Sequence, residues 1–438
     1  MFDPSGFPAA EVQFDKDGNL VGNDDDIMAV ATRADVTDLV FMAHGWNNDI
    51  RDAEGLFEGL ASVLRGVVSA NTVPAVAGRG IALAGVLWPS KKFADKDLIP
   101  GGAAAAGSPI EQRDVEHAVD DLRDLFPDAA GQAALDKAKS LVPQLEDKAT
   151  ARAQFAATLR SLLDEAAAEA EDATTELFTT EPGALMDRLA VPAVVTGPPV
   201  GAGAATSIDV TAESDTTGGA AGLGSTLGGA LGAAENYLNF LTYYTMKARA
   251  GDIGERGLAP LVARIRQKHA DLRIHLVGHS FGGRLVTAAV NQLPHDSVAT
   301  LTLLQAAFSH YGFSDAWSPG NPGHFRNAIV NHAVSGPVLI THTANDRAVG
   351  IAYALASRIA GQNAAAVGDA DDPYGGIGRN GAQKTPEAMF GELLEVSGAY
   401  TWTPHALHNL LADAFIKSHS DIRKPQVAYA ILSAVGST

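Results

Sequence analysis

The chain has 438 residues, 46% hydrophobic and 19% charged, so it can bury one large core or several ordinary ones. Its formal net charge of −19 repels phosphate backbones, which argues against a nucleic-acid partner. The absence of cysteine excludes disulfides, thiolate nucleophiles, zinc–thiolate sites and iron–sulfur clusters. The N-terminus has no signal-peptide pattern, and no apolar run is long enough for an integral membrane segment. We expect a globular, cytoplasmic protein, although this pattern leaves export by a route other than Sec open.

The first ninety residues follow a strand–helix–strand order. An Asp-Gly pair between short apolar pieces in residues 11–26 predicts a hairpin turn rather than a calcium loop. Residues 36–43 form a buried type of strand, residues 50–70 carry apolar positions at helical spacing, and residues 81–90 are a second short apolar run. This order is typical of an α/β sheet with crossover helices.

Residues 91–249 interrupt that rhythm, and we expect them to form a mostly helical insertion. Residues 111–126 and 151–173 are amphipathic helix patterns, while residues 194–234 are rich in Gly, Ala, Ser and Thr. A further helix over residues 235–250 is strongly apolar and aromatic. Its aromatic side chains would line a substrate pocket if the insertion is a lid, or would simply pack in a core: Tyr237, Phe240 and Tyr244. Apolar stripes at helical spacing favour the second interpretation.

The alternating pattern returns after the insertion and runs to the end of the chain. Strands are expected at 272–277, 297–308, 336–343 and 408–419, and helices at 258–268, 282–293, 345–360 and 424–435. Residues 362–400 have no assignable pattern. We therefore expect an α/β fold in which residues 1–90 and 250–438 form a mostly parallel sheet with helices on both faces.

The stretch HLVGHSFGGR, residues 275–284, carries the strongest chemical signal. It places Gly278-x-Ser280-x-Gly282 between an apolar strand and an amphipathic helix. Glycine is required on both sides because side chains there would collide in a sharp strand-to-helix turn. The serine would then stand at a helix N-terminus, where N–H groups and the helix dipole favour negative charge. The pattern predicts a nucleophilic serine.

A serine hydroxyl needs a histidine base, and the histidine needs an acid that fixes its tautomer. Asp346 lies three residues beyond the strand predicted at 336–343, and His419 lies between the last strand and the last helix. Both positions follow strand ends, where catalytic groups of parallel sheets gather.

Other side chains compete for these two roles. Asp315 is the main alternative acid, although it lies about ten residues into a loop, and Asp346 could equally be a helix cap. His405 precedes the last predicted strand and His408 is its first residue, so both lie at its wrong end. Asp421 is interpreted as a capping residue, and Asp413 as part of the strand.

The segment AHGWNND follows the first core strand and predicts an oxyanion hole. The main-chain N–H of Trp46 and that of Phe281, directly after the elbow serine, would be the two donors. Such donors typically contribute about 3 kcal/mol each to lowering the barrier. His44 and His279 flank these positions and are candidates for substrate contact.

The motifs FMAHGWNND, GVLWPS, HLVGHSFGGR, THTANDRAVG and KSHSDI, in this order, resemble the α/β-hydrolase superfamily, in particular its bacterial esterase- or lipase-like branches. The resemblance covers about residues 36–90 and 250–435. It implies a Ser-His-Asp triad, two main-chain oxyanion donors, an acyl-serine intermediate, and no cofactor or metal, with these residues: Ser280, His419, Asp346, Trp46 and Phe281. The 91–249 insertion departs from the superfamily's common cap position.

These patterns predict a serine hydrolase that cleaves a small-molecule or lipid carboxylic ester. Two other functions remain open at this point. One is a non-catalytic binding module on the same scaffold, with the insertion as the partner surface, and the other is a lipase that acts on membrane lipids.

Overall fold

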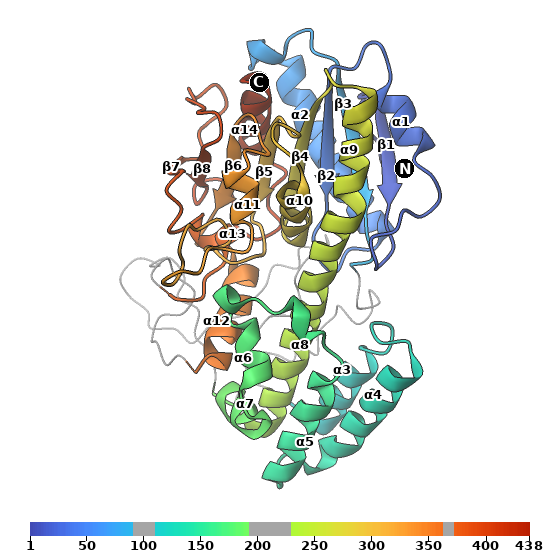
Figure 1. Ribbon diagram of the computed structural model, residues 1–438, viewed down its shortest axis with the longest axis vertical. Coiled ribbons are helices and arrows are strands. Elements are labelled where there is room, and N and C mark those ends of the chain that lie inside the picture. Colours follow the sequence, from blue (N-terminus) through green and yellow to red (C-terminus); the bar gives the residue numbers. More distant parts are fainter. Residues whose placement is uncertain (91–109, 192–228, 362–371) are drawn as a thin grey trace. The chain divides into compact units, whose positions relative to one another are not determined.

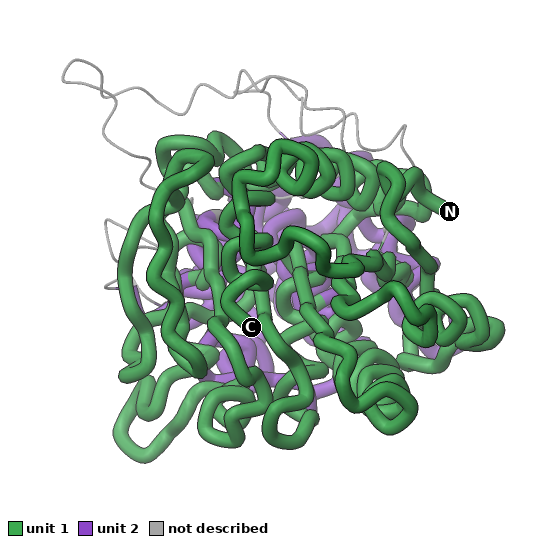
Figure 2. Tube along the Cα trace, turned by 90° about the horizontal axis from the view of Figure 1, so that it is seen from above, with its two compact units in different colours: residues 1–90, 247–346, 376–438 green, residues 91–246, 347–375 purple. Residues whose placement is uncertain are grey.

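The computed structural model describes residues 1–90, 110–191, 229–361 and 372–438, and the chain divides into two compact units (Figure 2). Unit 1 comprises residues 1–90, 247–346 and 376–438, and unit 2 comprises residues 91–246 and 347–375. Residues 347–375 therefore group with the insertion, whereas their sequence pattern predicts that they belong to the α/β core. The reason is that α12 (Arg347–Ile359) packs against α6 (Thr174–Thr179) and α7 (Pro182–Leu189).

Unit 1 is built on an eight-stranded sheet in the order β1-β3-β2-β4-β5-β6-β8-β7, in which every pair of neighbours is parallel (Figure 1). The central strands are buried on both faces, as expected of a parallel sheet covered by helices. The strands are β1 Ala9–Gln13, β2 Asp38–Ala43, β3 Ile81–Leu87, β4 Arg273–His279, β5 Thr300–Leu304, β6 Val338–His342, β7 Ala388–Glu392 and β8 Leu407–Leu411.

Helices cover both faces of this sheet. On one face, Val40 and Met42 of β2 belong to a core cluster with α2 and α14. Leu39 and Phe41 alternate with them along the strand and therefore face the opposite side. On that side, α10 packs on β2, β4 and β5. An α/β fold with a parallel sheet is thereby confirmed. The helices are α1 Asp25–Ala31, α2 Ile50–Ser69, α9 Ala259–Lys268, α10 Phe281–Gln292, α11 Arg326–Val330, α13 Ile377–Asn380 and α14 Pro425–Gly436.

Three local features of unit 1 differ from, or add to, the predicted elements. The Asp-Gly turn forms, with Gly18 at φ +83° and an antiparallel bridge from Phe14 to Leu20, but the preceding strand β1 pairs in parallel with β3. The edge strand β7 lies in the segment that had no assignable pattern, because four of its five residues are exposed and it lacks a hydrophobic periodicity. Strand β8 ends at Leu411, so Asp413 follows the strand instead of lying within it.

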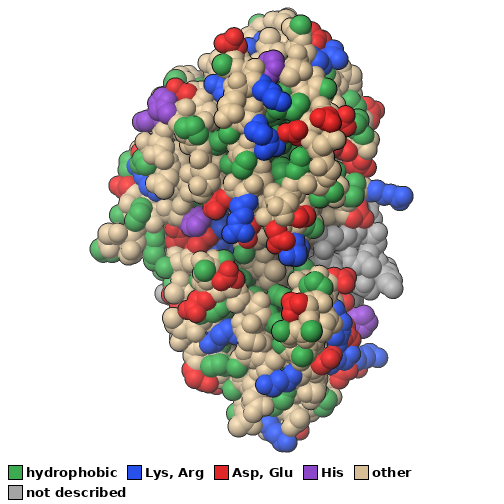
Figure 3. Space-filling view, turned by 45° about the vertical axis from the view of Figure 1, so that its right-hand side comes forward, with side chains coloured by type: hydrophobic (Ala, Val, Ile, Leu, Met, Phe, Trp, Pro, Cys, Tyr) green, Lys and Arg blue, Asp and Glu red, His purple; other side chains and the backbone are tan. Residues whose placement is uncertain are grey.

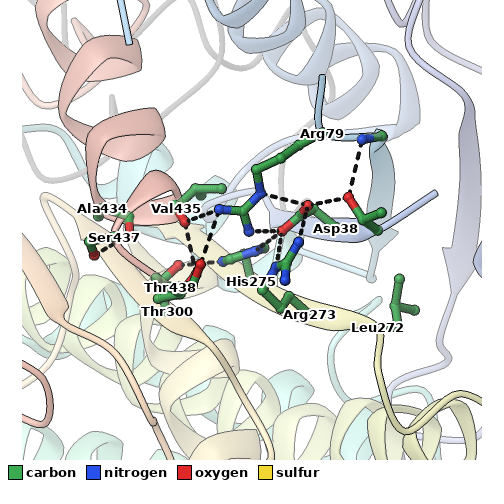
Figure 4. Close-up of polar contacts among 12 residues, drawn as sticks. Asp38, Arg79, Leu272, Arg273, His275, Thr300, Ala434, Val435, Ser437 and Thr438 are labelled. Carbon is green, nitrogen blue, oxygen red and sulfur yellow. Dashed lines mark hydrogen bonds and ion pairs between the residues drawn. The ribbon is translucent and has the colours of Figure 1, made fainter. Parts of the chain in front are cut away.

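A buried ionic cluster fixes the amino ends of the central strands (Figure 4). The Asp38 carboxylate is fully buried and accepts hydrogen bonds from Arg79, from Arg273 Nε at 2.9 Å and from His275 Nε2 at 3.0 Å. Burial alone would raise the pKa of Asp38, but the bonds from His275, Arg79 and Arg273 outweigh it and hold that pKa well below its usual range. Arg79 also donates to the Val435 carbonyl at 2.8 Å, which ties α14 to β2.

Unit 2 is helical in its described part. It contains α3 Gln112–Asp120, α4 Ala129–Leu141, α5 Ala149–Arg160, α6, α7 and α12, and α8 (Gly229–Ile253) crosses from unit 2 into unit 1. The aromatic side chains of α8 are buried: Tyr237 donates to the Ala156 carbonyl at 3.1 Å, Tyr244 donates to the Asp164 carbonyl at 2.5 Å, and Phe240 is 1% exposed. These contacts within unit 2 are those of core packing. Most of the Gly-rich stretch lies outside the described residues.

None of the described helices combines the length and the apolar character needed to cross a membrane. On the face drawn in Figure 3, acidic and basic side chains are interspersed. The acidic excess of the chain is therefore not gathered into one continuous patch on that face.

Candidate active site

The segments singled out for chemistry meet at the carboxyl edge of the unit 1 sheet. Residues 44–48 follow β2, Ser280 follows β4, Asp346 follows β6 and His419 follows β8. Because all strands are parallel, these segments leave the sheet at the same edge.

The turn after β4 holds Ser280 in a strained main-chain conformation, with φ +56° and ψ −124°. A Cβ at Gly278 would lie 2.3 Å from the carbonyl oxygen of Gly282, and a Cβ at Gly282 would lie 2.2 Å from that of Ala43. Both distances are too short for any side chain, so the two glycines permit the turn. The Ser280 carbonyl accepts from the N–H of Ala307 at 3.0 Å, which anchors the turn to the segment after β5.

The loop after β2 lies directly against this serine. A Cβ at Gly45 would stand 2.8 Å from the Ser280 Cβ and 3.3 Å from its Oγ, so only glycine allows this approach. His44 is buried and stacks on Trp88 with ring centroids 5.5 Å apart, and its Nε2 accepts from the Trp88 N–H at 3.3 Å. Burial lowers the pKa of His44 to about 4, so its ring is neutral and serves packing within the loop.

The WPS turn after β3 holds the other end of the same loop. Ser90 Oγ donates to the Asn48 carbonyl at 3.0 Å, and the Asn48 side chain donates to the Gly45 carbonyl at 3.1 Å. Asn47 takes φ +62° and donates from its main-chain N–H to the Ser90 carbonyl at 2.9 Å. These bonds fix the loop in the conformation that brings Gly45 to the serine.

Trp46 and Phe281, whose main-chain N–H groups are predicted to form an oxyanion hole, directly follow the two residues of this contact, Gly45 and Ser280. The main-chain N–H of Trp46 donates to no acceptor among the described residues, and Trp46 is 5% exposed. Phe281 is the first residue of α10, where the helix dipole favours negative charge. The ring centroids of Trp46 and Phe281 lie 6.3 Å apart, so the side chains of these two residues are neighbours.

Asp346 and His419 form a buried pair. His419 Nδ1 lies 2.8 Å from Asp346 Oδ2, and the side chains are 8% and 0% exposed. Because a carboxylate only accepts, His419 Nδ1 carries the hydrogen and Nε2 is left as the basic nitrogen. This pair has the geometry by which an acid fixes the tautomer of a catalytic base.

Neighbouring bonds hold the acid segment to the segment that carries the histidine. Asp413 Oδ1 accepts from Thr343 Oγ1 at 2.7 Å and from the Ala344 N–H at 2.9 Å, and Asn345 Nδ2 donates to the Ile416 carbonyl at 2.8 Å. The sequence pattern predicts Asp413 within a strand and indicates no such role for it. Its position two residues after β8 is the only sequence signal that could have indicated it.

The rival side chains make other contacts. Asp315 is exposed, and its main-chain N–H donates to the Lys384 carbonyl. His405 Nδ1 contacts the Val334 carbonyl at 2.9 Å, and His408 lies within β8 with its Nε2 3.1 Å from the Thr403 N–H. Asp421 accepts from the Lys417 N–H at 3.1 Å, as a turn-capping residue does.

His279, the residue before the serine, is buried beside the candidate base. Its Nε2 lies 2.9 Å from the His419 carbonyl oxygen, and the two rings are 4.8 Å apart. Burial and the neighbouring His419 lower the pKa of His279 to about 3, which keeps its ring uncharged near neutral pH.

Among the described residues, no group of three or more histidine, aspartate or glutamate side chains is placed to hold a metal ion. None of the protein-family models matches the chain, and neither the curated proteins nor the solved structures compared with it contain a match.

Proposed function

We propose that the protein is a serine hydrolase that cleaves carboxylic esters through an acyl-serine intermediate. The observation that carries the proposal is the buried Asp346–His419 pair at the same sheet edge as a serine in a strained, glycine-flanked turn. A purely structural serine would not need a disallowed φ or a glycine loop pressed against its side chain.

In the proposed mechanism, Ser280 Oγ attacks the ester carbonyl carbon while His419 Nε2 takes the hydroxyl proton. The carbonyl oxygen becomes an oxyanion, which the N–H groups of Trp46 and Phe281 would stabilise. His419 then gives the proton to the departing alkoxide, and an acyl-serine remains. A water molecule, deprotonated by the same histidine, attacks the acyl-serine and releases the acid and free Ser280.

Asp346 acts on the histidine rather than on the substrate. Its carboxylate holds Nδ1–H and stabilises the imidazolium that forms in each half-reaction. Because Asp346 is fully buried, its charge is poorly screened by solvent, which strengthens its interaction with the imidazolium.

The test is covalent labelling with a fluorophosphonate, with the modified residue located by mass spectrometry. Ser280 should be labelled in the wild type and not in Ser280→Ala, and hydrolysis of p-nitrophenyl acetate, butyrate and a long-chain ester should disappear in the same variant. Ser297, a buried serine that precedes β5 at the opposite edge of the sheet, provides the matched control as Ser297→Ala, which should still be labelled at Ser280. Absence of label in the folded wild type, with background rates of hydrolysis, would refute the proposal.

A further inference from the structure

We propose that His279 is a positioning residue that donates a hydrogen bond from Nε2 to the main-chain carbonyl of His419 and so holds the histidine loop against the serine turn. The effect on catalysis rests on the proposed function, whereas the contact between the two residues does not.

The fold brings the two histidines together from distant parts of the chain. His279 is the last residue of β4, and strand alternation places its side chain on the same face as Val277, in the core formed with α2 and α14. His419 lies 140 residues later in the turns between β8 and α14. The 2.9 Å bond therefore links the residue next to the serine with the main chain of the candidate base.

The direction of this bond follows from the chemistry of its two atoms. A carbonyl oxygen only accepts, so Nε2 of His279 carries the hydrogen, and the uncharged ring has a bare lone pair on Nδ1. That Nδ1 is buried and has no hydrogen-bond partner among the described residues, and a Cβ at Gly45 would lie 3.3 Å from it. A buried nitrogen without a hydrogen-bond partner lowers stability, and an apolar side chain of similar size would fill this space and avoid that cost. We therefore attribute the histidine at position 279 to the hydrogen bond that its Nε2–H donates, and not to packing.

The His419 main chain depends on this donor. Within the described ranges no other hydrogen bond to the main-chain N–H or carbonyl of His419 is formed. The bonds from the Asp421 N–H to the Ser418 carbonyl and from the Ile422 N–H to the Ser420 carbonyl stay within the same loop. On the N-terminal side, the next bond to another segment is the one from Asn345 to the Ile416 carbonyl, three residues before His419. Asp346 orients the imidazole at Nδ1 and His279 holds the main chain, so together they determine where Nε2 points. A shift of about 1 Å in a catalytic group can cost about 100-fold in rate.

Two substitutions separate the donor from the ring. In His279→Gln the side-chain amide nitrogen reaches about the place of Nε2 and can still donate to the carbonyl, whereas the shorter His279→Asn ends near the place of Nδ1. His408→Asn is the matched control, because His408 is also a buried histidine but lies in β8 and contacts Thr403. Each full-length variant is first checked for a cooperative thermal transition.

Two readouts decide the proposal. The first is steady-state hydrolysis of p-nitrophenyl butyrate: kcat should fall about 10- to 100-fold in His279→Asn with KM within about twofold of wild type, and His279→Gln should recover most of the loss. The second is the downfield proton NMR resonance of His419 Nδ1–H, assigned by its loss in His419→Gln. It should persist in wild type and His279→Gln and broaden or vanish in His279→Asn.

The outcomes keep the two proposals apart. If the wild type neither hydrolyses esters nor labels at Ser280, the hydrolase function fails and the NMR comparison alone decides the role of His279. If His279→Asn keeps both the resonance and kcat, or if His279→Gln and His279→Asn lose them equally, the positioning role is refuted. A loss of kcat in His408→Asn as large as in His279→Asn would also refute the positioning role, because the loss would then be a general effect of replacing a buried histidine.

Discussion

Stability of unit 1 should fall as the pH is lowered below the ordinary pKa of histidine, because buried histidines stay neutral in the folded chain. Burial lowers the pKa of His44 to about 4 and that of His279 to about 3, against about 6.5 when unfolded. The unfolded state therefore binds more protons, and the loss begins near pH 6.5 and levels off only near those folded pKa values. His275, His342 and His408 have lowered pKa values for the same reason and act in the same direction.

The magnitude follows from the shifts. A pH of about 5 lies about 1.5 units below the pKa of an unfolded histidine, and each unit corresponds to about 1.4 kcal/mol. His44 and His279 should therefore each lower the free energy of unfolding by about 2 kcal/mol at this pH. Together they would remove about 4 kcal/mol, a large part of a typical domain's 5–15 kcal/mol.

The assay is urea-induced unfolding followed by tryptophan fluorescence at about pH 7.5 and about pH 5. All four tryptophans lie in unit 1, namely Trp46, Trp88, Trp317 and Trp402, so the signal reports that unit. His44→Gln and His279→Gln each remove one titrating group, and each variant should lose about 2 kcal/mol less than wild type between the two pH values. Carboxylates are common to all three proteins and cancel in this comparison. An equal pH dependence in wild type and variants would refute the reasoning.

Further substitutions test other parts of the structure. Asp346→Asn should lower kcat by about 10⁴-fold without changing the fold, because the amide favours the wrong tautomer of His419. Asp315→Asn, in an exposed loop, should leave ester hydrolysis at the wild-type rate. Equal effects of the two substitutions would contradict Asp346 as the acid of the triad. Gly45→Ala should abolish fluorophosphonate labelling, because its Cβ would stand 2.8 Å from the Ser280 Cβ, and unchanged labelling would place the loop elsewhere. Asp38→Asn should cost about 3–5 kcal/mol in urea unfolding, since it removes the fully buried carboxylate that pairs with Arg79, whose side chain is only 11% exposed, and a loss below about 1 kcal/mol would contradict the ionic cluster.

The sequence by itself determined the local pieces of unit 1. The buried strands and the helices after them follow from apolar runs and helical spacing, which are local properties. The turn around Ser280 is local only in part: Gly278 is required by the carbonyl oxygen of Gly282 within the same turn, whereas Gly282 is required by the carbonyl oxygen of Ala43 at the end of β2. The α/β class follows from the order of these pieces.

Only the tertiary structure decided which pieces meet. The parallel pairing of β6 with β8 brings Asp346 within 2.8 Å of His419, and no local pattern states that these two strands are neighbours while β7 lies at the edge. Strand β7 itself is too exposed to carry a periodicity that predicts it.

The same distinction applies to the side chains that hold the site. Asp413 and His279 act on segments far away in the chain, the latter across 140 residues, so their roles depend on the fold and not on their neighbours in sequence. Local sterics and hydrophobic periodicity are written in short stretches of sequence, whereas strand order and buried hydrogen bonds arise from the packing of the whole unit.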